Sequence, residues 1–172
     1  MAVVWLVQLQ HYPLHVAVLE AENDVADGTT KANSAILHAG YDPEPGTQMA
    51  RLNVQGVALA KEICARLDVP YLQCGSLVLA LSPEELPHLQ KLYENGIANG
   101  VPGIRLLTAE ETLAMEPQLA PTVAGALFAP SAAIVSPWEF ALAMAEVAVR
   151  NGVELYRSTP VTNIEKIDGG WQ

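Results

Sequence analysis

The stretch HVAVLEAENDVADGTTKANSAILHAGYD, residues 15–42, decides how this chain folds. It opens with a short run of β-branched and apolar residues, His15 to Glu20, that ends in an acid. Such a run predicts a buried parallel strand. In dinucleotide-binding folds the second strand ends in an acid that bonds a ribose hydroxyl, and Glu20 fits that position. The alternative is an ordinary strand that ends in glutamate.

The polar segment after this strand has the composition of a loop that lies close to a ligand. Gly28 and Gly40 permit close approach of the backbone because they carry no side chain. A helix starting in this segment would add N–H groups for a pyrophosphate. The hydroxyl and amide donors of the segment are Thr29, Thr30, Asn33 and Ser34. The alternative is an ordinary polar loop, in which Lys31 is solvated rather than bound to a phosphate or a carboxylate.

The rest of the chain alternates between helical and strand patterns, which favours an α/β or α+β fold. Apolar spacing, capping residues and prolines predict helices over residues 46–67, 83–99, 108–115 and 137–151. Apolar and β-branched runs predict strands over residues 71–81, 104–107, 123–128, 153–156 and 160–167. Thr108 with Glu111, and Ser136 with Glu139, have the spacing of N-terminal caps. Asp168-Gly169-Gly170 predicts a hairpin turn, with Trp171 at the start of the return strand.

The composition argues against several classes of function. The chain has 172 residues, and its 19 acidic residues against 9 basic ones argue against a nucleic acid or an anionic membrane surface as partner. The longest apolar runs are far too short to cross a bilayer, and no basic segment precedes the N-terminal apolar run as in a signal peptide. Cys64 and Cys74 lack metal-binding or redox spacing. We therefore expect no metal, and a reduced pair of thiols buried in the core of a cytoplasmic protein.

Three segments, in the same order, carry a resemblance to a known family. Residues 16–42, VAVLEAENDVADGTTKANSAILHAGYD, resemble the second strand and following loop of FAD-dependent oxidoreductases of the glycine/D-amino-acid-oxidase-like superfamily. Glycerol-3-phosphate dehydrogenase-like and L-2-hydroxyglutarate dehydrogenase-like proteins are the members it resembles. Residues 74–89, CGSLVLALSPEELPHL, resemble the first strand of their substrate domain. Residues 116–165, EPQLAPTVAGALFAPSAAIVSPWEFALAMAEVAVRNGVELYRSTPVTNIE, resemble the return to the nucleotide domain. The resemblance runs from about Leu9 to Gln172.

The resemblance implies a partial FAD-binding, Rossmann-like domain joined to part of an α+β substrate domain, with FAD as cofactor. Residues 1–70 would belong to the FAD-binding region and residues 71–135 to the substrate domain. Residues 136–172 would return to the FAD-binding region and stop within a hairpin.

The resemblance also implies roles for individual residues. Glu20 would bind the adenosine ribose, and the backbone of Val161 would contact the adenine. Ile36, Leu37 and His38 would lie beside the isoalloxazine ring. His38 would act in catalysis by polarising the substrate or tuning the flavin, with a structural role as the alternative. The residues expected along the pyrophosphate and ribityl chain are Thr29, Thr30, Lys31, Asn33 and Ser34.

Two features of the family are missing from this chain. Members begin with a strand and a GxGxxG turn, which this chain lacks, and Met1 to Val7 stands where part of the first helix would be. Members also run on past the position of Gln172. We therefore expect a chain that is incomplete at both ends, and two functions stay open. One is FAD-dependent oxidation of a small hydroxy acid, polyol phosphate or amine by hydride transfer. The other is an inactive remnant that binds no FAD and self-associates through unpaired strand edges.

Overall fold

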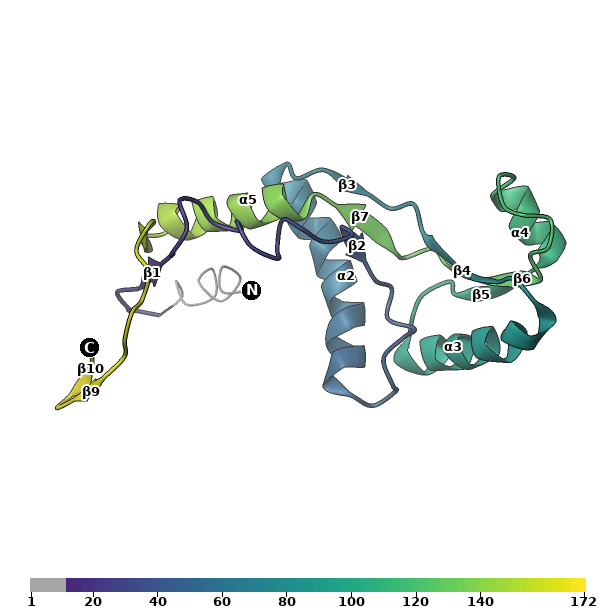
Figure 1. The fold of residues 1–172 in the computed structure, drawn as a ribbon, viewed down its shortest axis with the longest axis horizontal. Coiled ribbons are helices and arrows are strands. Elements are labelled where there is room, and N and C mark those ends of the chain that lie inside the picture. The colour runs from purple at the N-terminus through teal and green to yellow at the C-terminus, as the bar shows by residue number, and fades with distance from the viewer. Residues whose placement is uncertain (1–11) are drawn as a thin grey trace. The chain divides into compact units, whose positions relative to one another are not determined.

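The structure is a computed structural model that describes residues 12–172 (Figure 1). The segment from Met1 to Val7, expected in place of a first helix, lies outside the described residues. Contacts divide the chain into two compact units. The terminal unit comprises residues 1–34 and 136–172, and the middle unit comprises residues 35–135. The structure thus groups residues 35–70 with residues 71–135, whereas the sequence interpretation had placed them with the nucleotide region.

The terminal unit is organised around two parallel strands. Strand β1 (Ala17–Leu19) pairs with β8 (Glu154–Tyr156) in the register Ala17 to Glu154, which confirms the expected parallel strand. The expectation that this strand is buried was wrong, because Ala17 and Leu19 are exposed and Val18 is half-buried. Within the described residues the sheet has only these two strands, so each strand has one unpaired edge.

Helix α5 (Pro137–Arg150) leads into β8 and confirms the predicted helix. The hydroxyl of Ser136 accepts from the backbone N–H of Glu139, so the helix begins where the capping pattern predicted. Its apolar face supplies most of the buried residues of the terminal unit, among them Met144 and Ala148.

The C-terminal hairpin also forms as predicted. Strand β9 (Lys166–Ile167) pairs antiparallel with β10 (Gly170–Trp171), and Gly169 turns the chain with a φ of 83°. The predicted strand over residues 160–167 was wrong up to residue 165, where no regular strand forms. Pro160 has no backbone N–H to donate, and residues 161–164 are exposed, so burial does not favour a strand there. Glu165 exchanges two backbone hydrogen bonds with Gln172 and so only extends the hairpin.

The middle unit contains an antiparallel sheet in the order β4-β6-β5. Its strands are β4 (Ser76–Ala80), β6 (Gly125–Ala129) and β5 (Arg105–Thr108). Helix α3 (Leu86–Asn99), preceded by the 3-10 turn η1 (Pro83–Glu85), packs against this sheet. Leu89 and Leu92 of the helix join Leu127 of β6 in the largest cluster of buried side chains.

A second small sheet of the middle unit has the order β2-β7-β3. Its strands are β2 (Ile36–Leu37), β7 (Ala133–Val135) and β3 (Tyr71–Leu72). The sequence did not predict β2 and β7, because two or three residues are too short to show alternation. The predicted strand over residues 71–81 is split into β3 and β4 at Gly75, whose φ is 74°. A Cβ on Gly75 would lie 2.8 Å from the ring of Phe128, so the chain needs glycine there.

The two remaining helices of the middle unit confirm local sequence signals. Helix α2 (Gln48–Leu67) begins two residues later than predicted, because Thr47 caps it by accepting from Ala50 N. Helix α4 (Ala109–Met115) has both bonds of the capping box between Thr108 and Glu111. These bonds lower the pKa of Glu111 below its ordinary value. No helix among residues 12–172 is long and apolar enough to cross a membrane.

We predict that Leu19→Lys reduces self-association of the chain. Leu19 is 51% exposed on β1, and one edge of β1 has no partner strand among the described residues. A charge on an open strand discourages pairing with another chain. Light scattering after size exclusion should show a lower average mass for this variant than for the unaltered chain. The control Leu81→Lys, 55% exposed in the middle unit, should change nothing. An unaltered chain that stays monomeric at all concentrations would contradict the prediction.

Candidate functional site

The carboxyl ends of β1 and β8 meet at one edge of the terminal unit. Glu20 follows β1 directly, and its backbone N–H donates to Tyr156 O at 2.9 Å. Thr159 N donates back to Glu20 O at 2.8 Å, so the segments after both strands are bonded together. Ligands of open α/β sheets bind at the carboxyl ends of parallel strands. This edge is therefore the first candidate for a ligand site.

The carboxylate of Glu20 is held in place but keeps one oxygen open. Glu20 is half-buried, and its Oε1 accepts from Glu22 N at 3.0 Å. No donor among residues 12–172 bonds Oε2. A carboxylate fixed through one oxygen can accept a hydroxyl proton with the other, which is the chemistry that a ribose requires. Val161 lies two residues beyond Thr159 and is 54% exposed.

The polar loop of the terminal unit is a series of bends and turns. No helix begins within residues 21–34, so the extra N–H donors of a helix start are missing. Lys31 forms an ion pair with Asp27, and its side chain stays 46% exposed to solvent. The amide of Asn33 donates to Thr30 O at 2.7 Å. The loop residues that remain exposed for a ligand include Thr29, Thr30 and Ser34.

An exposed apolar row crosses the small sheet of the middle unit. Ile36 of β2 and Leu72 of β3 both pair in register with Ile134 of the central strand β7. These three side chains are 44%, 58% and 41% exposed, respectively. Residues directly opposite each other share one face of a sheet. The row is a flat apolar surface of the kind that a planar ring can cover.

His38 follows β2 directly, next to this row. Strand alternation would place its side chain on the same face as Ile36 and would place Leu37 on the other. The imidazole of His38 is exposed and bonds no group among the described residues. It can therefore donate to or accept from a ligand on that face.

The backbone after His38 is fixed by packing and by one amide. Ala39 is 1% exposed, and a Cβ on Gly40 would lie 2.6 Å from Val54 Cγ2. The side-chain nitrogen of Asn99, at the end of α3, donates to Gly40 O at 2.9 Å and to Pro43 O at 2.8 Å. The sequence had identified Asn99 only as a helix end. Helix α3 thus positions the segment that carries His38.

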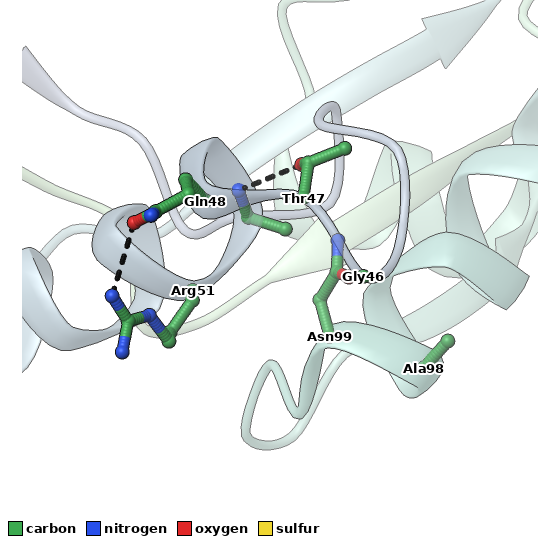
Figure 2. A pocket seen from close by; sticks show the side chains of 7 residues that line it. Gly46, Thr47, Gln48, Arg51, Ala98 and Asn99 are labelled. Atoms are coloured by element: carbon green, nitrogen blue, oxygen red, sulfur yellow. Dashed lines mark hydrogen bonds between the residues drawn. The ribbon is translucent and has the colours of Figure 1, made fainter.

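An open hollow of about 510 Å³ lies at the start of α2 (Figure 2). Figure 2 shows Gln48 and Arg51 on one side of it and Ala98 and Asn99 on the other. Arg51 donates to Gln48 Oε1 at 3.0 Å, and the hydroxyl of Thr47 accepts from Ala50 N. The polar groups of this helix start bond each other, so we assign no ligand to the hollow.

The structure divides the predicted site residues between the units. Glu20, Val161 and the loop residues from Thr29 to Ser34 belong to the terminal unit, whereas Ile36, Leu37 and His38 belong to the middle unit. Sequence reasoning missed Leu72, Ile134 and Asn99. Their roles depend on pairing between distant segments, for which a single sequence carries no local signal.

Comparison with known proteins places this arrangement in a family. The family described as FAD dependent oxidoreductase matches residues 4–172. Glycerol 3-phosphate dehydrogenase of Caloramator mitchellensis is 49% identical over 165 residues, which cover 96% of this chain and 34% of that protein. Human mitochondrial L-2-hydroxyglutarate dehydrogenase is 38% identical over 157 residues, covering 91% of this chain and 34% of that protein.

Solved structures agree with the sequence relatives. The L-alpha-glycerophosphate oxidase of Mycoplasma pneumoniae with FAD bound has a TM-score of 0.90 and 29% identity. That match covers 98% of this chain and 45% of the oxidase chain. Glycine oxidase of Geobacillus kaustophilus has a TM-score of 0.84 and 28% identity, with coverage of 95% and 45%. The expected fold class is confirmed, and the chain spans about a third of the length of these curated relatives.

We predict that Asn99→Ala destabilises the chain by about 1–3 kcal/mol, because Gly40 and Pro43 would both lose a partly buried hydrogen-bond donor. Urea unfolding should show a lower midpoint with an unchanged slope. The matched control is Asn95→Ala, on the same helix, because the side chain of Asn95 forms no hydrogen bond with the described residues. Equal stability of the two variants would show that the Asn99 bonds contribute nothing.

Proposed function

This chain belongs to the FAD-dependent oxidoreductase family, and we propose that it contributes the adenosine-ribose contact and one wall of the flavin-ring site in such an enzyme. The reaction would oxidise a small hydroxy acid, polyol phosphate or amine. The observation that carries the proposal is the carboxyl edge of β1 and β8, where Glu20 presents an oxygen that no described donor bonds.

FAD is the cofactor of this family, and the donor set of the chain fits its parts. Glu20 would hold the adenosine ribose, and the backbone of Val161 would lie against the adenine. The loop with Thr29, Thr30, Lys31, Asn33 and Ser34 would follow the pyrophosphate and ribityl chain. Lys31 is engaged by Asp27, so the hydroxyls of the loop are better placed than its ammonium to reach a phosphate.

The apolar row of Ile36, Ile134 and Leu72 supports a place for the ring system in the middle unit. A flat aliphatic surface excludes water from a planar aromatic group without bonding it in a fixed orientation. Leu37, on the opposite side of β2, would support the strand from beneath. His38 would stand at the end of the row, where its imidazole could bond the ring or a substrate anion.

FAD supplies the redox chemistry by accepting a hydride from a C–H bond next to oxygen or nitrogen. The chain would supply orientation and electrostatics. A protonated His38 donates to the oxygen of a bound carboxylate or phosphate and holds that end of the substrate. A neutral His38 can instead accept the hydroxyl or ammonium proton that leaves as the C–H bond breaks.

The relatives suggest two substrate classes. The Caloramator relative is a glycerol 3-phosphate dehydrogenase and the human relative an L-2-hydroxyglutarate dehydrogenase. Glycerol 3-phosphate is the first substrate to try, because the Caloramator protein has the higher identity to this chain. We place residues 136–172 in the FAD-binding region as proposed from the sequence, and residues 71–135 in the substrate region.

The proposal also includes the cellular location of the protein and its binding partners. Cys64 and Cys74 are both free thiols, which supports a cytoplasmic protein. The expected burial is confirmed for Cys64 and was wrong for Cys74, which is exposed. A small molecule is the proposed substrate, and the open edge of β1 is the proposed route to self-association. The alternative function remains a chain that neither binds FAD nor catalyses, and the next experiment separates it from the enzyme.

The test is a chimera in which this chain replaces the matching segment of the Caloramator dehydrogenase. We predict that Glu20→Ala weakens FAD binding by about tenfold to a hundredfold, the cost of one hydrogen bond to a charged group. FMN affinity should change little, because FMN has no adenosine ribose. Flavin fluorescence titrations measure both affinities, and Glu22→Ala is the control. Equal losses for FAD and FMN would place Glu20 elsewhere. A chimera that retains no FAD, beside a parent that does, would favour the inactive alternative.

In the same chimera we predict that His38→Ala slows flavin reduction by glycerol 3-phosphate by about tenfold to a thousandfold, the range for one electrostatic contact in a transition state. FAD affinity should persist, because the ribose contact is made by another residue. Stopped-flow absorbance follows the reduction, with His88→Ala, an exposed histidine of α3, as control. Reduction of the His38 variant at the parental rate would give His38 a structural role.

A further inference from the structure

The turn after β8 contains a residue in an unfavourable backbone conformation. Ser158 has a φ of 52°, in the left-handed region that residues other than glycine rarely adopt. Its side chain is exposed and forms no hydrogen bond with the described residues, so the side chain does not stabilise this conformation. The turn is instead held by the hydrogen bonds of its backbone.

Two consecutive N–H groups of this turn bond the segment that follows β1. Ser158 N donates to Glu22 O and Thr159 N donates to Glu20 O, both at 2.8 Å. In an extended strand consecutive N–H groups point to opposite sides, so one neighbouring segment receives only every second group. A left-handed residue turns the chain so that successive N–H groups point to the same side. The φ of Ser158 thus directs two amides to the segment that carries Glu20.

The same bonds restrain the carboxylate of Glu20. Glu22 N donates to Glu20 Oε1 at 3.0 Å, and the carbonyl of Glu22 accepts from Ser158 N. Thr159 holds the carbonyl of Glu20 itself. Loss of the Ser158 bond would therefore release Glu22 and the oxygen Oε1 that it holds. Oε2, the oxygen proposed to accept from the ribose hydroxyl, would then have no fixed position.

The turn also sets the path of the chain to Val161. Thr159 is bonded to Glu20 O and is followed by Pro160, whose ring restricts φ to about −65°. Val161, proposed to contact the adenine through its backbone, comes directly afterwards and is 54% exposed. Both proposed contacts to the adenosine half of FAD therefore depend on one turn.

We propose that Ser158 is a positioning residue for the adenosine half of FAD, because its left-handed backbone fixes the ribose contact of Glu20 and the adenine contact of Val161 together. This inference rests on the proposed function, since it concerns the same cofactor. Ser158 itself touches no part of FAD and acts through these two residues. The conformation at residue 158, rather than the hydroxyl of its side chain, is the property that matters.

The first test uses the chain itself and needs no ligand. Ser158→Val introduces a β-branched residue, which tolerates a left-handed φ poorly, whereas Ser158→Asn introduces one that adopts it readily. Amide hydrogen exchange, corrected for residue type, should be slow at residues 158 and 159 in the unaltered chain and in the Asn variant. In the Val variant we expect exchange about tenfold faster. The control is Asp68→Val, at an exposed residue of the middle unit with a φ of 54°, which should leave both amides protected.

The second test uses the chimera with the Caloramator dehydrogenase. Ser158→Val should weaken FAD binding about tenfold and leave FMN affinity unchanged, because FMN has no adenosine. Ser158→Asn should bind FAD as the parent chimera does. Asp68→Val should lower the thermal midpoint and leave the ratio of FAD to FMN affinity unchanged. Flavin fluorescence titrations give these affinities, and this ratio is the quantity that a merely structural role of Ser158 would not alter.

Unchanged amide exchange or unchanged FAD affinity in the Ser158→Val variant would overturn the inference. Equal losses of FAD and FMN affinity would assign Ser158 a general structural role instead. The Glu20→Ala variant separates this inference from the proposed function. A loss of FAD affinity in Glu20→Ala, without a loss in Ser158→Val, would overturn the role of Ser158 alone. FAD affinity that is unchanged in both variants would overturn the role of Ser158 and the ribose contact together.

Discussion

The parallel pairing of β1 with β8 is the constraint on which the arrangement of this chain depends. It pairs Ala17 with Glu154, which lie before and after the middle unit in the sequence. The chain between these two residues must therefore leave the strand pair and return to it. In the middle unit, the first strand, β2, pairs with the last strand, β7. Ile36 of β2 lies opposite Ile134 of β7, and Val135 N donates to Ala35 O at 3.0 Å. The chain thus enters and leaves the middle unit through adjacent strands.

This topology explains where the predicted site residues of each unit lie. Parallel pairing places the segments after β1 and β8 at one edge of the sheet. There the backbone N–H of Thr159 donates to Glu20 O. The entry and exit strands, together with β3, form the small sheet that carries the apolar row. Residues proposed to contact FAD therefore come from the ends of the connections between units, where polar loops meet short strands. The larger sheet and α3 carry none of the residues proposed to contact FAD.

Single side chains of the middle unit fix the backbone of particular loops. Asn99 bonds two carbonyl groups beyond His38, and Gly40 passes so close to Val54 that no other residue fits without movement. Gln73 similarly connects Lys61 to the carbonyl of Pro130. The first amide fixes the backbone just after the candidate catalytic histidine, and the second orients the ammonium of Lys61. Both use a neutral amide, which can orient a neighbour without adding charge.

The elements with local signals could be predicted from the sequence alone. Helices α4 and α5 begin at the predicted capping residues, and the hairpin turns at Gly169, because these bonds join residues within a few positions. Glu20 at the end of β1 and the family resemblance could also be predicted, because both depend on short stretches of sequence. The burial of β1 and the strand over residues 160–165 were predicted wrongly, since both depend on neighbours that a pattern of residues does not supply.

Contacts between distant segments could be seen only in the folded chain. The row of Ile36, Ile134 and Leu72 joins residues up to 98 positions apart through strands of two or three residues, which are too short to show periodicity. The bonds of Asn99 to the loop after His38 span 56 and 59 positions. Hydrogen bonds and apolar contacts of this kind form only when the two segments are already folded side by side. A local pattern therefore predicts a strand or a helix, whereas the ligand-facing surface exists only in the assembled sheet.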